Sequence, residues 1–76
     1  MTPSQTIRDI FRASRATQRE FRAAIGVPTA RFCYWLARAD DEDHGREYMG
    51  AMRYSEPGAA DIARAFDVAR RMIAEA

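Results

Sequence analysis

Apolar residues recur at three- and four-residue intervals along most of the chain, and turn-forming residues separate the runs. The first run places Ile7, Ile10 and Phe11 on one face of a helix that ends near Arg15. This helix begins with Thr2-Pro3-Ser4-Gln5, which has the spacing of a capping box with proline at the first helical position. The pattern therefore predicts an amphipathic N-terminal helix.

Two further helices are predicted between residues 17 and 39, joined by a tight turn. A second capping box begins the first of them at Thr17, and Gly26 ends it because glycine adopts positive φ at low cost. Proline can open a helix, so the next one covers residues 28–39 and ends by Asp40, where a run of acids would oppose the helix dipole. The apolar stripes comprise Phe21, Ala24 and Ile25, then Phe32, Trp35, Leu36 and Ala39.

The C-terminal part of the chain carries one more helical pattern. Residues 55–58 favour a helix start, and the apolar positions then recur at intervals of four, three and four. Asp67 and Arg71 lie four residues apart on the opposite face and can pair. The expected buried face comprises Ile62, Phe66, Ala69 and Ile73, widened on one flank by Ala65, Val68 and Met72.

Residues 40–56 have no single interpretation. Tyr48, Met49 and Met52 fit one face of a short helix, whereas Gly50-Ala51 fits the turn of a small hairpin wing. We favour an extended loop with a short helical turn.

Charge divides the 76-residue chain into two halves. Residues 1–39 contain seven arginines against two acids, a net charge of +5, whereas residues 40–76 contain five arginines against nine acids, a net charge of −4. One half should therefore attract polyanions. The length favours a single domain without a deep catalytic cavity, and the one cysteine excludes an intrachain disulfide. No apolar run suggests a signal peptide or a membrane span, so we expect a cytoplasmic protein.

The order and spacing of residues from Thr17 to Ala39 resemble the helix-turn-helix of the Cro/C1 (Xre-like) repressors. The resemblance covers about residues 6–39. The resemblance implies an all-α, lambda-repressor-like domain of four to five helices, with the helix-turn-helix at 17–39 of a single domain, 1–76. Two features depart from the family: Arg22 stands where alanine is usual, and the acidic loop is longer. The matching residues are Thr17, Gln18, Phe21, Ile25, Gly26, Val27, Phe32 and Trp35.

A helix-turn-helix implies sequence-specific binding of double-stranded DNA, with helix 28–39 in the major groove. Arginine can bind guanine or phosphate, a small side chain such as Ala30 permits close approach, and the start of the preceding helix can hold a phosphate. The expected DNA-binding residues are Thr17, Gln18, Arg19, Thr29, Ala30, Arg31, Cys33, Tyr34 and Arg38, with Arg15 as a further phosphate contact.

The wide apolar stripe of the last helix suggests a homodimer that binds an inverted repeat, although the same residues can instead close the core of one chain. The expected interface residues are Met49, Met52, Tyr54, Val68 and Met72. The resemblance extends to small phage repressors, antitoxins and anti-CRISPR-associated autoregulators, which suggests repression of a promoter.

Other chemistry finds little support in the sequence. His44 is the single histidine and has no partner at metal-ligand spacing, and Cys33 has no histidine suitably placed for nucleophilic catalysis. We therefore expect no enzyme activity, no cofactor, no metal and no small-molecule substrate. The alternative function is a small helical protein-binding module, or an antitoxin, whose basic face binds an acidic protein.

Overall fold

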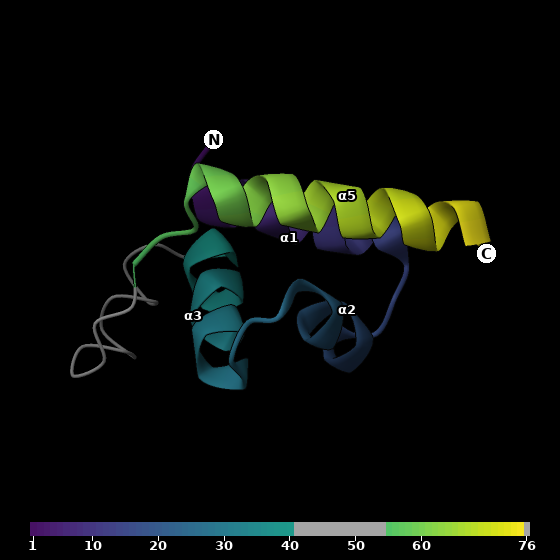
Figure 1. The fold of residues 1–76 in the computed structure, drawn as a ribbon. Helices are drawn as coiled ribbons and strands as arrows, with labels where there is room; N and C mark the ends of the chain where they lie inside the picture. The colour runs from purple at the N-terminus through teal and green to yellow at the C-terminus, as the bar shows by residue number, and fades with distance from the viewer. Residues whose placement is uncertain (41–54, 76) are drawn as a thin grey trace.

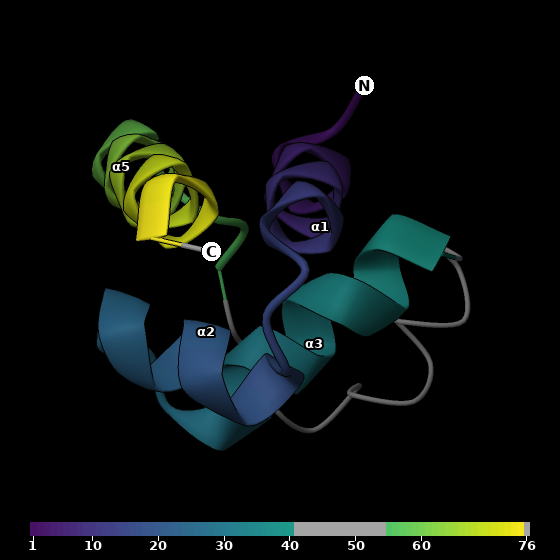
Figure 2. The same cartoon turned by 90° about the vertical axis from the view of Figure 1, so that its right-hand side faces the viewer.

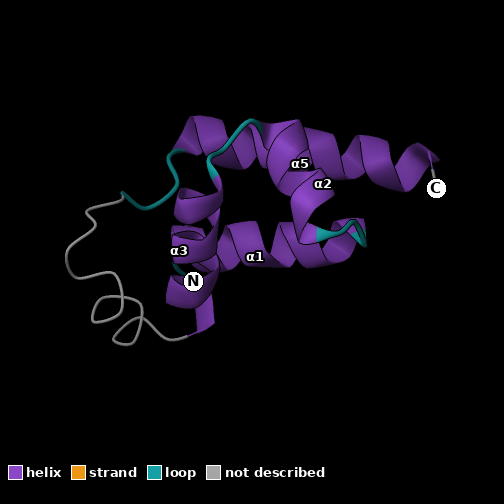
Figure 3. Cartoon of the chain, turned by 90° about the horizontal axis from the view of Figure 1, so that it is seen from below, coloured by secondary structure: helices purple, strands orange, loops and turns teal. Residues whose placement is uncertain are grey.

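The computed structural model describes residues 1–40 and 55–75, and every regular element in these residues is a helix. α1 and α5 lie side by side in one layer, and α2 and α3 form a second layer beneath them (Figures 1 and 2). Short loops join the first three helices (Figure 3). The expected all-α fold class is confirmed. The helices are α1 (Pro3–Ser14), α2 (Gln18–Ile25), α3 (Thr29–Asp40) and α5 (Ala59–Glu75).

Local side-chain hydrogen bonds define where the first two helices begin. The hydroxyl of Thr2 accepts from the amide of Gln5, and the side chain of Gln5 accepts from the amide of Thr2 at 2.8 Å. Thr17 and Glu20 repeat this reciprocal arrangement at the start of α2. Each box satisfies amide groups that the first helical turn leaves without a helical partner, so both predicted capping boxes are confirmed.

Left-handed residues end the same two helices. Gly26 has a φ of 72° after α2, as predicted, and an added Cβ there would meet nothing within 4 Å. Arg15 has a φ of 58° after α1, a conformation that costs a non-glycine residue roughly 1–2 kcal/mol. The two turns bring α2 and α3 back beneath α1.

Three phenylalanines, one from each of the first three helices, form the centre of the core. The ring centroids of Phe11 and Phe21 are 5.3 Å apart, and those of Phe11 and Phe32 are 5.6 Å apart in an edge-to-face arrangement. Phe21, Phe32 and Trp35 are almost completely buried, as their apolar stripes predict. This packing sets the angle at which α3 leaves the core.

The structure corrects the predicted orientation of the last helix. α5 buries Ala65, Val68 and Ala69, whereas Phe66 and Ile73 are 62% and 53% exposed. The helix is rotated because the small Ala65 and Ala69 allow it to pack closely on α1, which the larger Phe66 would prevent.

Two expected interface residues are affected by this rotation. Val68 belongs to the core of its own chain, which favours the alternative that these residues close the core. Met72 is half-buried against the same core. The other three, Met49, Met52 and Tyr54, lie outside the described residues, as does most of the loop expected at 40–56.

Contacts between distant residues tie α3 to α1 and to the residues before α5. Arg8 Nη1 donates to the carbonyl of Ala39 at 3.0 Å and lies 3.4 Å from the carboxylate of Asp40. A cation is favourable at this end of α3, where the helix dipole is negative. Trp35 Nε1 donates to the carbonyl of Ser55 at 2.8 Å, which fixes the chain just before α5.

Candidate nucleic-acid interface

The outer face of α3 is open to solvent along its first half. Phe32 and Trp35 point into the core, so residues on the opposite face of the helix are presented outward. Tyr34 is half-buried near the middle of the helix. The exposed residues are Thr29, Ala30, Arg31 and Cys33, all four among those predicted to contact DNA.

Arg38 lies apart from this exposed group. Its side chain is 16% exposed, and its Nη2 lies 3.2 Å from Oε1 of Glu56. The guanidinium carbon also sits 5.9 Å from the centroid of the Tyr34 ring. Glu56 in turn accepts a hydrogen bond from the buried hydroxyl of Ser4. Arg38 is thus engaged in joining α3 to the residues before α5.

The start of α2 supplies a second group of exposed polar side chains. Gln18 and Arg19 are exposed, and Thr17 is exposed while its hydroxyl serves the capping box. The amide of Gln18 reaches across to α3, where its Nε2 lies 3.4 Å from Sγ of Cys33. The structure therefore brings Gln18 of α2 beside Cys33 of α3, two of the predicted residues.

A surface hollow of about 390 Å³ lies where the starts of α2 and α3 meet. Two guanidinium groups, an amide and a hydroxyl line it, from Gln18, Arg19, Arg22 and Thr29. Groups of this kind donate hydrogen bonds to phosphate oxygens. Arg22 was not predicted as a site residue, although its spacing of three and four residues from Arg19 and Gln18 places all three on one helix face.

Arg22 also has a structural contact. Its Nη1 donates to the carbonyl of Val27 at 3.1 Å, so the side chain spans the turn from α2 to α3. The backbone carbonyl of Arg22 accepts from the amides of Gly26 and Val27 at 3.0 and 3.3 Å. The side chain thus binds the turn that joins the two helices.

One carboxylate shares the start of α2 with these cationic groups. Hydrogen bonds from the backbone amide and then the hydroxyl of Thr17 lower the pKa of Glu20 below its ordinary value. Glu20 is therefore ionised at neutral pH and favourably placed near the positive end of the α2 dipole. Its charge would oppose an anion bound directly at this helix end, so Arg19 and Arg22 carry the attraction.

No three side chains of the metal-ligating types His, Cys, Asp and Glu gather in the described residues, and His44 lies outside them. No helix in that part of the chain has both the length and the apolar character needed to cross a bilayer. Comparison with protein-family models, with curated proteins and with solved structures finds no match to this chain.

Proposed function

We propose that this chain is a sequence-specific DNA-binding transcriptional regulator that inserts α3 into the major groove. The observation that carries the proposal is the exposed first half of α3, where the small Ala30 stands beside Arg31. A single α-helix matches the width of the major groove, and arginine is the commonest reader of guanine edges. The resemblance to Cro/C1 repressors points to the same helix.

The start of α2 supports the proposal by offering donors for the DNA backbone. Gln18, Arg19 and Arg22 surround one hollow beside Thr29. Phosphate contacts of this kind set the register of a recognition helix without reading sequence. The net charge of +5 on residues 1–39 would attract the duplex to this side of the molecule.

The regulatory mode follows from the same proposal. We propose a repressor that acts in the cytoplasm without catalysis, by covering a promoter. Binding an inverted repeat as a homodimer would require two copies of α3 on one side of the duplex, roughly 34 Å apart. Association with an acidic protein through the exposed arginines is the alternative function.

The test is DNA binding with duplexes selected by the chain from a random pool. We expect Arg31→Ala to weaken binding to the selected duplex by about fivefold or more, since one good base contact contributes about 1–3 kcal/mol. Arg64→Ala is the matched control, because it removes the same charge from the exposed side of α5. It should change affinity by less than about twofold, as expected for a charge outside the contact surface.

Two outcomes would contradict this function. Selection that enriches no sequence would exclude specific binding, and equal effects of the two arginine substitutions would exclude α3 as the reading helix. Affinity should also fall steeply with salt, by a logarithmic slope of about −0.9 for each phosphate contacted. If the chain binds an acidic protein instead, no duplex would be selected and Arg31→Ala would abolish binding of that protein.

A further inference from the structure

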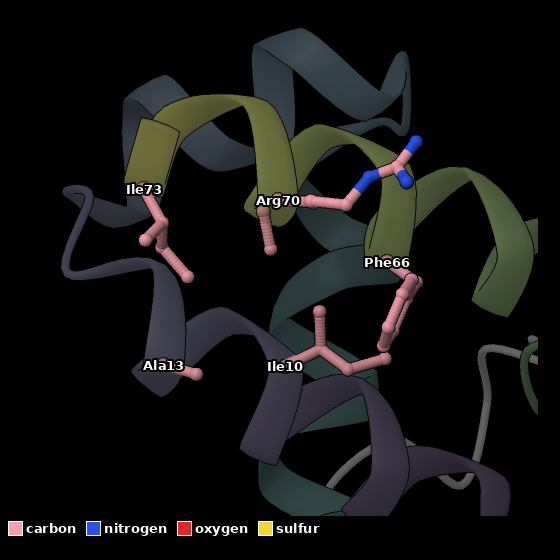
Figure 4. A pocket seen from close by; sticks show the side chains of 6 residues that line it. Ile10, Ala13, Phe66, Arg70 and Ile73 are labelled. Atoms are coloured by element: carbon pink, nitrogen blue, oxygen red, sulfur yellow. The ribbon is translucent and has the colours of Figure 1, made fainter. Parts of the chain in front are cut away.

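An apolar groove runs between α1 and α5 on the side away from α2 and α3. Figure 4 looks into this groove, which holds about 210 Å³ and is lined by Ile10, Ala13, Phe66, Ala69, Arg70 and Ile73. Phe66 and Ile73 are two of the three exposed large hydrophobic residues in the described part of the chain. Exposed aromatic and aliphatic side chains gathered on one face are typical of an interaction surface.

The exposed stripe of α5 has the symmetry of a surface that fits a copy of itself. Phe66 and Ile73 lie seven residues, or two helical turns, apart, with the small Ala69 near their midpoint. When two such helices lie antiparallel about this midpoint, Phe66 of each copy meets Ile73 of the other. Each phenyl ring then enters the hollow beside the second copy's Ile73, above the buried Ala69.

The charges beside this stripe favour the same antiparallel arrangement. Asp67 binds Arg70 at 3.2 Å and also pairs with Arg71 within its own chain. Asp67 precedes the midpoint and Arg70, which lines the groove, follows it, so antiparallel copies place Asp67 of one near Arg70 of the other, whereas Arg71 lies on the α2 side of α5. A parallel pair would instead set like charges against each other, which is unfavourable.

We propose that the groove between α1 and α5 is occupied by a second copy of this chain, with the two α5 helices antiparallel. α5, the longer helix of the pair, spans about 26 Å, so a contact along this one face is smaller than the roughly 800 Å² per partner of a standard specific interface. The pairing is therefore expected at micromolar concentrations and not at nanomolar ones.

This pairing sets the direction of the two α3 helices. Because α2 and α3 form the layer opposite the groove, two copies joined at the groove carry their α3 helices on opposite outer sides (Figure 2). This consequence rests on the proposed function: if each α3 binds DNA, such a pair would hold two separate DNA segments together. The antiparallel pair is thus distinct from the dimer needed to bind one inverted repeat.

Sedimentation equilibrium tests the pairing between about 1 and 300 µM. This is the concentration range in which an interface of this small area is expected to form a dimer. Phe66→Glu should raise the dimer dissociation constant at least tenfold, with the helical content unchanged because Phe66 is exposed. Ala23→Glu adds the same charge at an exposed position of α2 and should leave the dimer intact. A wild-type chain that stays monomeric throughout, or a dimer that survives Phe66→Glu, would overturn the proposal.

Cross-linking tests the antiparallel direction in a chain whose one cysteine is removed by Cys33→Ser. A mixture of Phe66→Cys chains and Ile73→Cys chains should form disulfide-linked pairs of unlike chains, while each variant alone should form few. Pairing of each variant with itself, and none in the mixture, would indicate parallel helices and overturn the proposal.

Capture of a second duplex tests the consequence for DNA. Wild-type chain on an immobilised selected duplex should retain a free labelled duplex, whereas Phe66→Glu should bind one duplex with unchanged affinity and retain no second one. Retention that persists with Phe66→Glu would contradict the role of the groove in joining the segments. A chain that forms the cross-link but binds no duplex would refute the proposed function and leave the pairing established.

Discussion

The side chain of Arg22 takes part both in the turn between α2 and α3 and in the candidate interface. Its guanidinium binds the carbonyl of Val27 and also borders the hollow beside Gln18 and Arg19. Alanine at this position would leave that carbonyl without this donor. One arginine therefore stabilises the turn and contributes positive charge at the candidate interface.

We predict that Arg22→Ala lowers the free energy of unfolding by about 1 kcal/mol, because it removes one part-buried hydrogen bond to a charged donor. Denaturant unfolding followed by circular dichroism measures the change. Arg19→Ala, an exposed position of the same helix, is the control and should shift stability by no more than about 0.5 kcal/mol. Equal stability of Arg22→Ala and the wild type would show that the hydrogen bond to Val27 makes no net contribution.

At the scale of the element, α2 depends on its capping box. The helix has eight residues, a length at which an isolated helix is marginal, so its first turn needs both the Thr17–Glu20 pair and the burial of Phe21. The start of this helix was predictable from sequence because all the groups that cap it lie within four residues. The contact between Arg8 and the end of α3 was not, because it joins residues 31 apart.

The capping carboxylate predicts a dependence of stability on pH. Glu20 has a lowered pKa in the folded chain, so its contribution is present above the pKa of the unfolded chain and is lost as pH falls through the lower, folded value. Glu20→Gln keeps an acceptor for the amide of Thr17 but does not titrate. Thermal unfolding between pH 7 and pH 3 should therefore show a smaller loss of stability in Glu20→Gln than in the wild type. An identical decline in both proteins would exclude Glu20 as a source of the acid sensitivity.

Across the whole molecule, α5 presents one apolar surface to the core and a second to solvent. Sequence periodicity predicted one wide stripe, and the structure divides it between Val68, in the core, and Phe66, beside the outer groove. The division depends on how closely α1 and α5 approach. That approach is set by Ala65 and Ala69, which are small enough to lie between the two helices.

This division predicts unequal effects of two substitutions that lie two residues apart. Val68→Ala should destabilise the chain by about 2 kcal/mol, because it leaves a cavity in a packed core. Phe66→Ala should cost less than about 1 kcal/mol when measured in dilute, monomeric protein, because its ring is already mostly in water. Urea unfolding of the two variants measures both values. A larger loss with Phe66→Ala would mean that the helix buries the face expected from periodicity.

Some features of the candidate site could be predicted from the sequence, and others depend on the tertiary structure. Ala30 and Arg31 were predictable as outward residues because Phe32 and Trp35 mark the buried face of the same helix. The partnership of Arg38 with Glu56, and the meeting of Gln18 with Cys33, depend on how separate helices are placed. Spacing along one helix cannot report such contacts.

By itself the sequence determined the helices of residues 1–40, their starts and ends, and the face that each of α2 and α3 turns inward, because caps, glycine and periodicity act within a few residues. Only the tertiary structure decided the rotation of α5, the engagement of Arg22 and Arg38, and the apolar groove opposite α3. These features result from side-chain volumes and charges that meet across distant parts of the chain, where packing outweighs local preference.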